Sequence, residues 1–315
     1  MNKVEKKLDV LCLGAAVVDI PLRPVSREVF DIESYPVDNI AMAVGGDAMN
    51  ESTIISRLGC KTGLMAAIGD DAAGAFILRS CDEDNIDTEG VTIDPNLNTS
   101  INIGLVTEDG ERTFITVQGA ECHFKKEWFE QIDMDNYENI YIAGYQVCGK
   151  SGEIISQWLK TVENVEEKHI FFAPGPMITA IESETMENLF ALKPILHINE
   201  AEAKSYTQQE NVEEAVRALY EKSGNLVFVT LGAEGTLFYD GKEMRRVASV
   251  KTNVVDTVGA GDSHIGAIIA GMSKGMKVED AVLLANRTAA AIVGTSGPVM
   301  DLEEFQKISE EWENE

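Results

Sequence analysis

The stretch Val-Val-Asp-Thr-Val-Gly-Ala-Gly-Asp-Ser-His, residues 254–264, runs directly into the apolar segment Ile-Gly-Ala-Ile-Ile-Ala-Gly-Met, residues 265–272. Its small residues at 259–261 allow the backbone to approach a ligand closely. Such a turn at the start of a helix presents N–H groups to an anion. Asp262 would repel that anion unless it acts on a neutral hydroxyl, so the stretch predicts phosphoryl transfer to an alcohol. The alternative is that Asp262 only caps a buried helix.

The rest of the chain alternates between short apolar runs and helical patterns, which predicts an α/β fold with a mostly parallel sheet between two layers of helices. The predicted strands are 9–14, 62–68, 140–143, 169–173, 195–198 and 226–230. The predicted helices include 50–58, which Gly59 ends, together with 71–81 and 301–315.

Two segments interrupt this alternation. Residues 15–44 contain three prolines and end in an alternating apolar pattern, and residues 99–118 form two period-2 runs around the turn Glu108-Asp109-Gly110. The second segment predicts a β-hairpin. Together the two insertions predict a small β-sheet beside the main one, either as a lid over a site at the carboxyl ends of the main strands or as an edge sheet without function.

Composition limits the partners. The chain has 315 residues, with 26 basic and 53 acidic side chains and a net charge of −27. Such a chain on average repels nucleic acid and anionic membranes, so neither is expected as a partner. The five cysteines form no Cys-x-x-Cys pair, and the chain has no run of 18 apolar residues. These features predict a cytoplasmic protein with free thiols.

Four motifs in register resemble the ribokinase-like (pfkB-type) carbohydrate kinase family. Asp256-Thr-Val-Gly-Ala-Gly-Asp262 matches its Asp-Thr-x-Gly-Ala-Gly-Asp signature, and Gly45-Gly46-Asp47-Ala48-Met49-Asn50 resembles its Gly-Gly-x-x-x-Asn motif. Asn199-Glu-Ala-Glu202 resembles an Asn-x-x-Glu motif, and Thr230-Leu-Gly-Ala-Glu-Gly235 a nucleotide-side turn. The resemblance covers nearly the whole chain and implies one ribokinase-like kinase domain over residues 1–315, with the insertions as its lid.

The resemblance also implies roles for individual residues. Asp262 would be the general base, and Gly259, Ala260 and Gly261 with the Asp262 backbone would form the anion hole. Sugar hydroxyls would be held by Asp19, Gly45, Gly46 and Asn50. ATP would be bound by Asn199, Glu202, Thr230, Gly232, Gly235 and, as a weaker candidate near adenine, Asn286. Glu202 would organise Mg²⁺ through water, because Mg²⁺ keeps several of its waters.

Further implications concern a cation and two departures from the family pattern. Asp256 and the backbone of Val258, with backbone carbonyls from residues 292–297, would contribute to a monovalent cation site, so K⁺ is an additional candidate cofactor. Asp47 stands where several branches have Lys or a small residue, which argues against a sugar phosphate unless Asp47 faces away. His264 stands where the family often has Phe, and it is expected to be a packed helix residue.

The resulting prediction is an ATP-dependent kinase that phosphorylates a hydroxymethyl group of an unphosphorylated sugar. A nucleoside is the main rival acceptor, with Phe30, Tyr35 or Phe114 as a wall for the base. Alternatives from other classes are a sugar-binding regulator without catalysis and a dinucleotide-binding oxidoreductase, although the glycines after the first strand do not form Gly-x-Gly-x-x-Gly. Because lid sheets can pair between subunits, the resemblance also allows a homodimer through the lid.

Overall fold

The computed structural model describes residues 7–37, 39–108, 111–295, 297 and 299–313. Within these residues a large sheet holds eight strands in the order β15-β14-β13-β12-β11-β10-β1-β5. The strands from β5 to β13 along this order are parallel, and β14 runs antiparallel to both of its neighbours, β13 and β15. Their bounds are β1 (Leu8–Leu13), β5 (Thr62–Met65), β10 (Tyr137–Ala143), β11 (His169–Ala173), β12 (Ile195–Asn199), β13 (Val227–Thr230), β14 (Thr236–Tyr239) and β15 (Met244–Val247).

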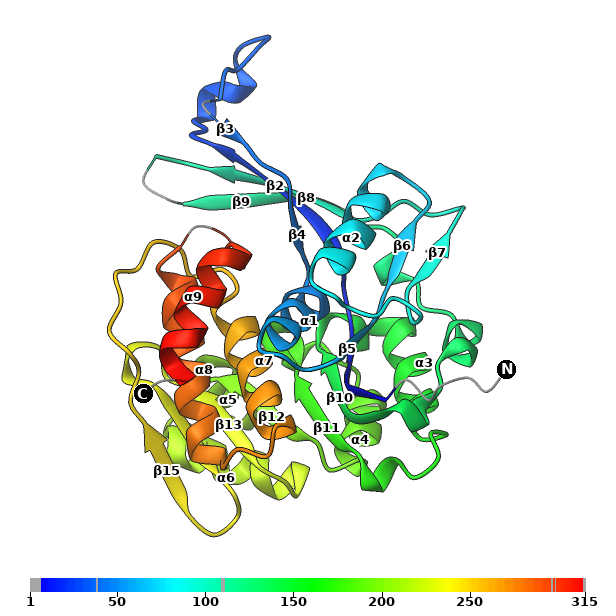
Figure 1. Ribbon diagram of the computed structural model, residues 1–315, viewed down its shortest axis with the longest axis vertical. Coiled ribbons are helices and arrows are strands. Elements are labelled where there is room, and N and C mark those ends of the chain that lie inside the picture. The colour runs from blue at the N-terminus through cyan, green and yellow to red at the C-terminus, as the bar shows by residue number, and fades with distance from the viewer. Residues whose placement is uncertain (1–6, 38, 109–110, 296, 298, 314–315) are drawn as a thin grey trace.

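Helices cover both faces of this sheet, as Figure 1 shows. Alternate residues of β1 serve two different cores: Val10 and Cys12 pack on one side, and Leu11 and Leu13 on the other. A strand buried on both faces explains why its sequence is a continuous apolar run. The three-layer α/β/α prediction is therefore confirmed.

The first face is covered by α1 (Asp47–Arg57), α2 (Ala72–Glu83), α7 (Ala260–Ser273), α8 (Val278–Val293) and α9 (Leu302–Glu313). The second face is covered by α3 (Gly149–Leu159), α4 (Ser183–Ala191), α5 (Glu200–Thr207) and α6 (Val212–Ser223). Helix α7 is buried from Ser263 to Gly271, in the middle of the first layer. None of the helices in the described ranges is long and apolar enough to cross a membrane.

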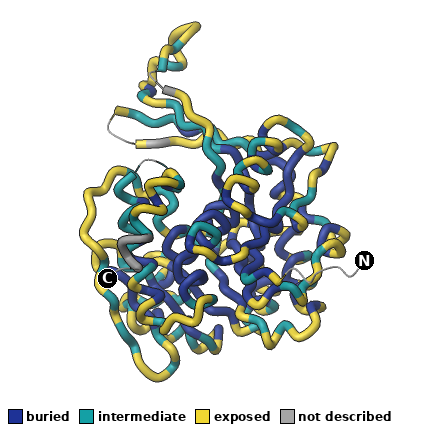
Figure 2. Tube along the Cα trace, in the orientation of Figure 1, coloured by how far each residue is buried: buried dark blue, intermediate teal, exposed yellow. Residues whose placement is uncertain are grey.

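A smaller sheet stands away from this body, as the sequence predicted. It contains β2 (Val17–Arg23), β3 (Asn39–Ile40), β4 (Ala43–Gly45), β8 (Ile101–Val106) and β9 (Arg112–Val117). Strands β8 and β9 form the predicted hairpin, whose turn residues 109 and 110 lie outside the described residues. Figure 2 shows that the far part of this sheet is a mixture of exposed and intermediate residues, whereas its base joins the buried body.

The structure corrects the predicted strand 62–68. This stretch divides into β5 and β6 (Ala67–Gly69), and β6 pairs with β7 (Thr92–Asp94) in a separate two-stranded sheet. The sequence shows no sign of the break between β5 and β6, because every residue from 62 to 69 is buried and the apolar run continues across Ala66. The antiparallel strands β14 and β15 extend the sheet beyond the last strand predicted from the sequence, 226–230.

Candidate functional site

The base predicted from the sequence lies in the first turn of α7, beside α1. The side-chain amide Nδ2 of Asn50 donates a hydrogen bond of 2.7 Å to Oδ2 of Asp262. One turn further along both helices, a Cβ at Gly266 would lie 3.1 Å from Cβ of Ile54, so the helices approach closely there. The small residue at 266 therefore brings Asn50 within reach of Asp262. Burial raises the pKa of Asp262, the bond from Asn50 lowers it, and the charge of Asp19 raises it.

The small sheet supplies a second carboxylate. Oδ1 of Asp19, on β2, accepts a 2.9 Å hydrogen bond from Nδ2 of Asn102, its partner in the β2–β8 register. A Cβ at Gly45 would lie only 2.0 Å from Oδ2 of Asp19. Gly45 therefore makes room for the Asp19 carboxylate, and Asn102 fixes its orientation.

The start of α1 joins these groups to the loop after β1. Gly46 adopts a φ of +93°, and a Cβ there would lie 2.6 Å from the carbonyl oxygen of Ala15. Oδ1 of Asp47 accepts hydrogen bonds from the backbone N–H groups of Ala15 (2.9 Å) and Ala48 (2.8 Å). Oδ2 of Asp47 is buried without a hydrogen-bond partner among the described residues. Asp47 thus fixes the backbone around the site.

The glycine-rich turn leads into α7 as predicted. Gly259 is the N-cap residue, in the left-handed region with a φ of +75°. The N–H of Ala260 makes a long 3.4 Å bond to the Thr257 carbonyl, and those of Gly261 and Asp262 lie in the first helical turn, where no intrahelical acceptor exists. Ala260 and Gly261 also line a cavity of about 890 Å³. The turn therefore brings its N–H donors to the wall of this cavity.

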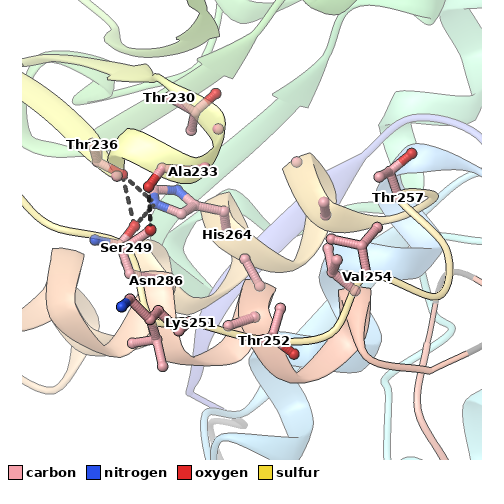
Figure 3. Close-up of a pocket in the computed structure, with 18 of the residues that line it drawn as sticks. Thr230, Ala233, Thr236, Ser249, Lys251, Thr252, Val254, Thr257, His264 and Asn286 are labelled. Carbon is pink, nitrogen blue, oxygen red and sulfur yellow. Dashed lines mark hydrogen bonds between the residues drawn. The ribbon is translucent and has the colours of Figure 1, made fainter.

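The same cavity holds the residues predicted on the nucleotide side. Thr230, Gly232, Gly235 and Asn286 all line it, and the loop from Ser249 to Thr257 forms its outer wall (Figure 3). Gly235 needs to be glycine because it has a φ of +93° and a Cβ would lie 2.0 Å from the Val247 carbonyl oxygen. Apolar atoms of Val254, Ala289, Ala290 and Val293 line the cavity as well. Its size and lining fit the base and ribose of a nucleotide.

Asn199 and Glu202 lie together at the carboxyl end of β12, outside the cavity lining. They form a capping box at the start of α5, in which Asn199 Oδ1 accepts from the Glu202 N–H (2.8 Å) and Glu202 Oε2 accepts from the Asn199 N–H (3.2 Å). Burial raises the pKa of the Glu202 carboxyl. The motif thus has a clear structural use, which does not conflict with a role for the Glu202 carboxylate near phosphates.

The residues predicted for a monovalent cation site lie where two segments meet. Oδ1 of Asp256 accepts from the Val258 N–H at 3.0 Å, and the carbonyl of Val293 accepts from the N–H groups of Val255 and Asp256. The loop before α7 is therefore tied to the end of α8. Residue 296, part of the predicted carbonyl set, lies outside the described residues.

Asn286 and His264 form a buried hydrogen-bond network on the inner wall of the cavity (Figure 3). Thr236 Oγ1 donates to Asn286 Oδ1 (2.8 Å), and His264 Nε2 lies 2.7 Å from Thr236 Oγ1 and 3.1 Å from Asn286 Oδ1. His264 Nδ1 lies 2.9 Å from Nε2 of His197. Burial lowers the pKa of His264 to about 4, so it is neutral near pH 7. His264 is a buried helix residue, as expected, and it also lines the cavity.

Sequence reasoning missed three parts of this site. Asn102 could have been found from the hairpin, because its register places it beside Asp19. Thr236 follows the glycine turn directly, but only the pairing of β14 points it toward His264. Glu51 gave no signal: it is 1% exposed, and its Oε1 accepts a 2.7 Å bond from the Tyr141 hydroxyl.

Comparison with solved structures defines the class of fold. An adenosine kinase from Sinorhizobium meliloti superimposes with a TM-score of 0.81 at 23% identity, covering 97% of this chain and 99% of that one. A putative ribokinase II from Escherichia coli, solved in complex with ATP and Mg²⁺, gives a TM-score of 0.79 at 21% identity, covering 96% and 99%. The fold is therefore ribokinase-like.

Comparison of sequences identifies the family. The model of the pfkB family carbohydrate kinases matches residues 7–304, and the chain belongs to this family. Among curated proteins, the uncharacterized sugar kinase YegV of Escherichia coli (strain K12) is 28% identical over 305 residues, which cover 94% of this chain and 92% of the relative. The class of enzyme is thus a phosphotransferase with an alcohol group as acceptor.

Proposed function

We propose that this protein transfers the γ-phosphoryl group of ATP to a hydroxymethyl group of an unphosphorylated sugar. The observation that carries the proposal is the hydrogen-bonded pair Asp262 and Asn50, 2.7 Å apart, directly after a turn of N–H donors that lines a nucleotide-sized cavity. A base, an anion hole and a nucleotide cavity are the three parts that this reaction needs. They also argue against a sugar-binding regulator that has lost catalysis.

Asp262 is the general base in this mechanism. Its carboxylate takes the proton of the acceptor hydroxyl while that oxygen bonds to the γ-phosphorus and the bond from phosphorus to the ADP oxygen breaks. The amide of Asn50 holds the carboxylate in one orientation. The N–H groups at Ala260, Gly261 and Asp262 stabilise the charge of the transferring group. Because base catalysis needs an ionised Asp262, activity is lost as the pH falls through its raised pKa.

ATP lies in the cavity between the turn at Gly232 and Gly235 and the loop 249–257. Magnesium fits this arrangement: Glu202 is a partly buried carboxylate outside every described ion pair, and Mg²⁺ prefers such oxygens. Among the described residues no cluster of three His, Cys, Asp or Glu could hold a metal ion. Glu202 and Asn199 would therefore hold the ion through water, with the phosphates as its other ligands. The ion supplies charge neutralisation on the phosphates.

The acceptor side supports an unphosphorylated sugar. Asp19, Asn50, Asn102 and Asp262 offer carboxylate and amide groups that suit hydroxyl groups. None of the described ion pairs involves Asp19 or Asp262. Asp47 is not one of these groups, because its carboxylate is bonded to the backbone of Ala15 and Ala48. A phosphorylated sugar would bring a second anion to the carboxylates of Asp19 and Asp262, which no described ion pair neutralises. The substrate is therefore an unphosphorylated sugar.

A nucleoside is a second candidate acceptor, and Phe114 favours it. In the sheet register Phe114 pairs with Gly104, which pairs with Pro21, so Phe114 lies on the same face as Asp19. A Cβ at Gly104 would lie 3.3 Å from the Phe114 ring, which therefore covers that glycine. The other two candidates for a wall against the base are less suited to it: Tyr35 is hydrogen-bonded to Ser26, and Phe30 is 80% exposed.

The small sheet acts as a lid in this proposal, because its strand β2 carries Asp19 to the acceptor. Its exposed apolar residues Ile40, Met42, Ile115 and Val117 fit pairing with a second copy of the chain. The homodimer and the potassium site at Asp256 and Val258 both stay predictions. Sedimentation at several protein concentrations tests the first, and activity with and without K⁺ tests the second.

The proposed function is tested by an ADP-release screen. The purified protein is assayed with ATP and Mg²⁺ against ribose, fructose, other ketoses, sugar acids, nucleosides and sugar phosphates. The proposal expects its highest kcat/KM on an unphosphorylated sugar. A maximum on a nucleoside would favour the second candidate, and a maximum on a sugar phosphate would overturn the interpretation of the acceptor side.

A further inference from the structure

The side-chain amide of Asn286 is fully used inside the protein. Its Nδ2 donates to the carbonyls of Val247 (3.3 Å) and Ala248 (3.1 Å), and its Oδ1 accepts from Thr236 and His264. An amide has two N–H donors and two acceptor lone pairs. All four are occupied, so Asn286 has nothing left to offer a bound base unless it gives up a bond to the protein.

The positions of the protons follow from the same contacts. The two carbonyls fix which end of the Asn286 amide is nitrogen, so Oδ1 must face His264. Because Oδ1 only accepts, and the Thr236 hydroxyl already donates its proton to Oδ1, the ring proton of neutral His264 belongs on Nε2. This N–H is shared between Oγ1 of Thr236 (2.7 Å) and Oδ1 of Asn286 (3.1 Å). Nδ1 of His264 is then an acceptor, and it receives the Nε2–H of His197 at 2.9 Å. His264 is therefore saturated as well.

The network ends on the segment where the outer wall of the cavity begins. Val247 is the last residue of β15, and the chain from Ala248 to Val258 has no helix or strand and is largely exposed. Ser249 adds a bond from its hydroxyl to the Ala233 carbonyl. Asn286 thus ties the start of this loop to α8, and His264 connects the same bonds to α7, two residues after Asp262.

We propose that Asn286 and His264 are positioning residues that clamp the loop 248–258 over the nucleotide, and that neither of them reads the base. This inference rests on the proposed nucleotide site and replaces the expected contact of Asn286 with adenine. The base then binds by the shape and apolar lining of the cavity, so replacing the clamp weakens all purine nucleotides alike.

The variant Asn286→Asp tests the clamp. The aspartate keeps an acceptor for Thr236 and His264 but places an oxygen, instead of an NH₂ group, against two carbonyls. Loss of two hydrogen bonds predicts a rise of about tenfold in the KM for ATP. The KM values for GTP and ITP rise by the same factor, and kcat at saturating nucleotide falls less than the KM values rise. A change of more than about fivefold in the ATP-to-GTP or ATP-to-ITP preference would mean that Asn286 reads the base.

Limited digestion with trypsin gives a readout that does not need turnover. Lys251 lies in the clamped loop and is exposed, whereas Lys160 lies at the end of α3 on the opposite layer. In Asn286→Asp, cleavage after Lys251 becomes faster while cleavage after Lys160 keeps its wild-type rate. Equal cleavage after Lys251 in both proteins would refute the clamp even if the protein proved not to be a sugar kinase.

His264→Phe is the second variant, for the case that the aspartate prevents folding. Phenylalanine fills similar space but removes the proton that His264 gives to Asn286. It is expected to raise KM for the three nucleotides together and to speed cleavage after Lys251, more weakly than Asn286→Asp. Wild-type values for both measurements would overturn the role of His264.

Discussion

The free energy of unfolding should depend on pH through the carboxyl of Asp47, and the variant Asp47→Asn should lose this dependence. Burial raises the pKa of Asp47 from 3.8 to about 7, with a further contribution from the charge of Asp262. In the unfolded chain the same group titrates near its ordinary value of about 3.9. At a pH between these two pKa values, the Asp47 carboxyl is ionised in the unfolded chain but still protonated in the folded protein. The free energy of unfolding that Asp47 contributes therefore falls as the pH rises from about 4 to about 7, and it stays low above pH 7.

The magnitude follows from the two pKa values. One unit of pKa corresponds to about 1.4 kcal/mol, and the effect levels off as the pH reaches the folded pKa. Between pH 5 and pH 8 the wild type should lose about 2 to 3 kcal/mol relative to Asp47→Asn. The asparagine keeps an oxygen for the N–H groups of Ala15 and Ala48, so the main change is the loss of a titrating group.

Urea unfolding of both proteins at pH 5, 6, 7 and 8 measures this difference. The free energy of unfolding of Asp47→Asn, relative to that of the wild type, should increase with each step up to pH 7. Asp82→Asn, which removes one charge at an exposed site on α2, is the matched control and should follow the wild type at every pH. Parallel curves for wild type and Asp47→Asn would show that Asp47 is ionised in the folded protein and would refute the reasoning.

Three more predictions concern the site. Asn50→Leu should move the acid limb of the kcat/KM profile to higher pH, because the bond from Asn50 lowers the pKa of Asp262; an unmoved limb would contradict this role of Asn50. Gly45→Ala places a methyl group where the Asp19 carboxylate lies, so the KM for the sugar should rise by about tenfold or more, in a protein with a wild-type circular dichroism spectrum. Asn102→Leu removes the donor to Asp19 and should raise the KM for the sugar about five- to tenfold, whereas an equal rise in the KM for ATP would indicate general distortion.

Much of the fold was predictable because the signals were local. The run 9–14 and the hairpin 101–117 show their strands in the residues themselves, and Asp71 caps α2 with a bond to the Gly74 N–H, close to the predicted start. The break at Ala66 was not predictable, because buried apolar residues continue on both sides of it. It depends on which strands lie next to β5 and β6, which is a property of the assembled fold.

The candidate site likewise contains residues that the sequence predicts and residues whose role only the structure shows. Asp262, Asn50 and the glycine turns stand in motifs, so their types and spacing carry information. The role of Asn286 could not be read from the sequence, since it depends on contacts with residues 39 and 50 positions away. Asp47 likewise looked like a substrate-facing acid, and only the structure places its Oδ1 on the backbone of Ala15 and Ala48.

The central claim is that Asp262 is the general base. The most direct test is single-substrate kinetics of Asp262→Asn on the best acceptor found in the screen, with thermal unfolding measured on the same sample. Loss of a positioned base predicts a fall in kcat of about 10²- to 10⁴-fold in a folded protein that still binds ATP. A well-folded Asp262→Asn with near wild-type kcat would contradict the account.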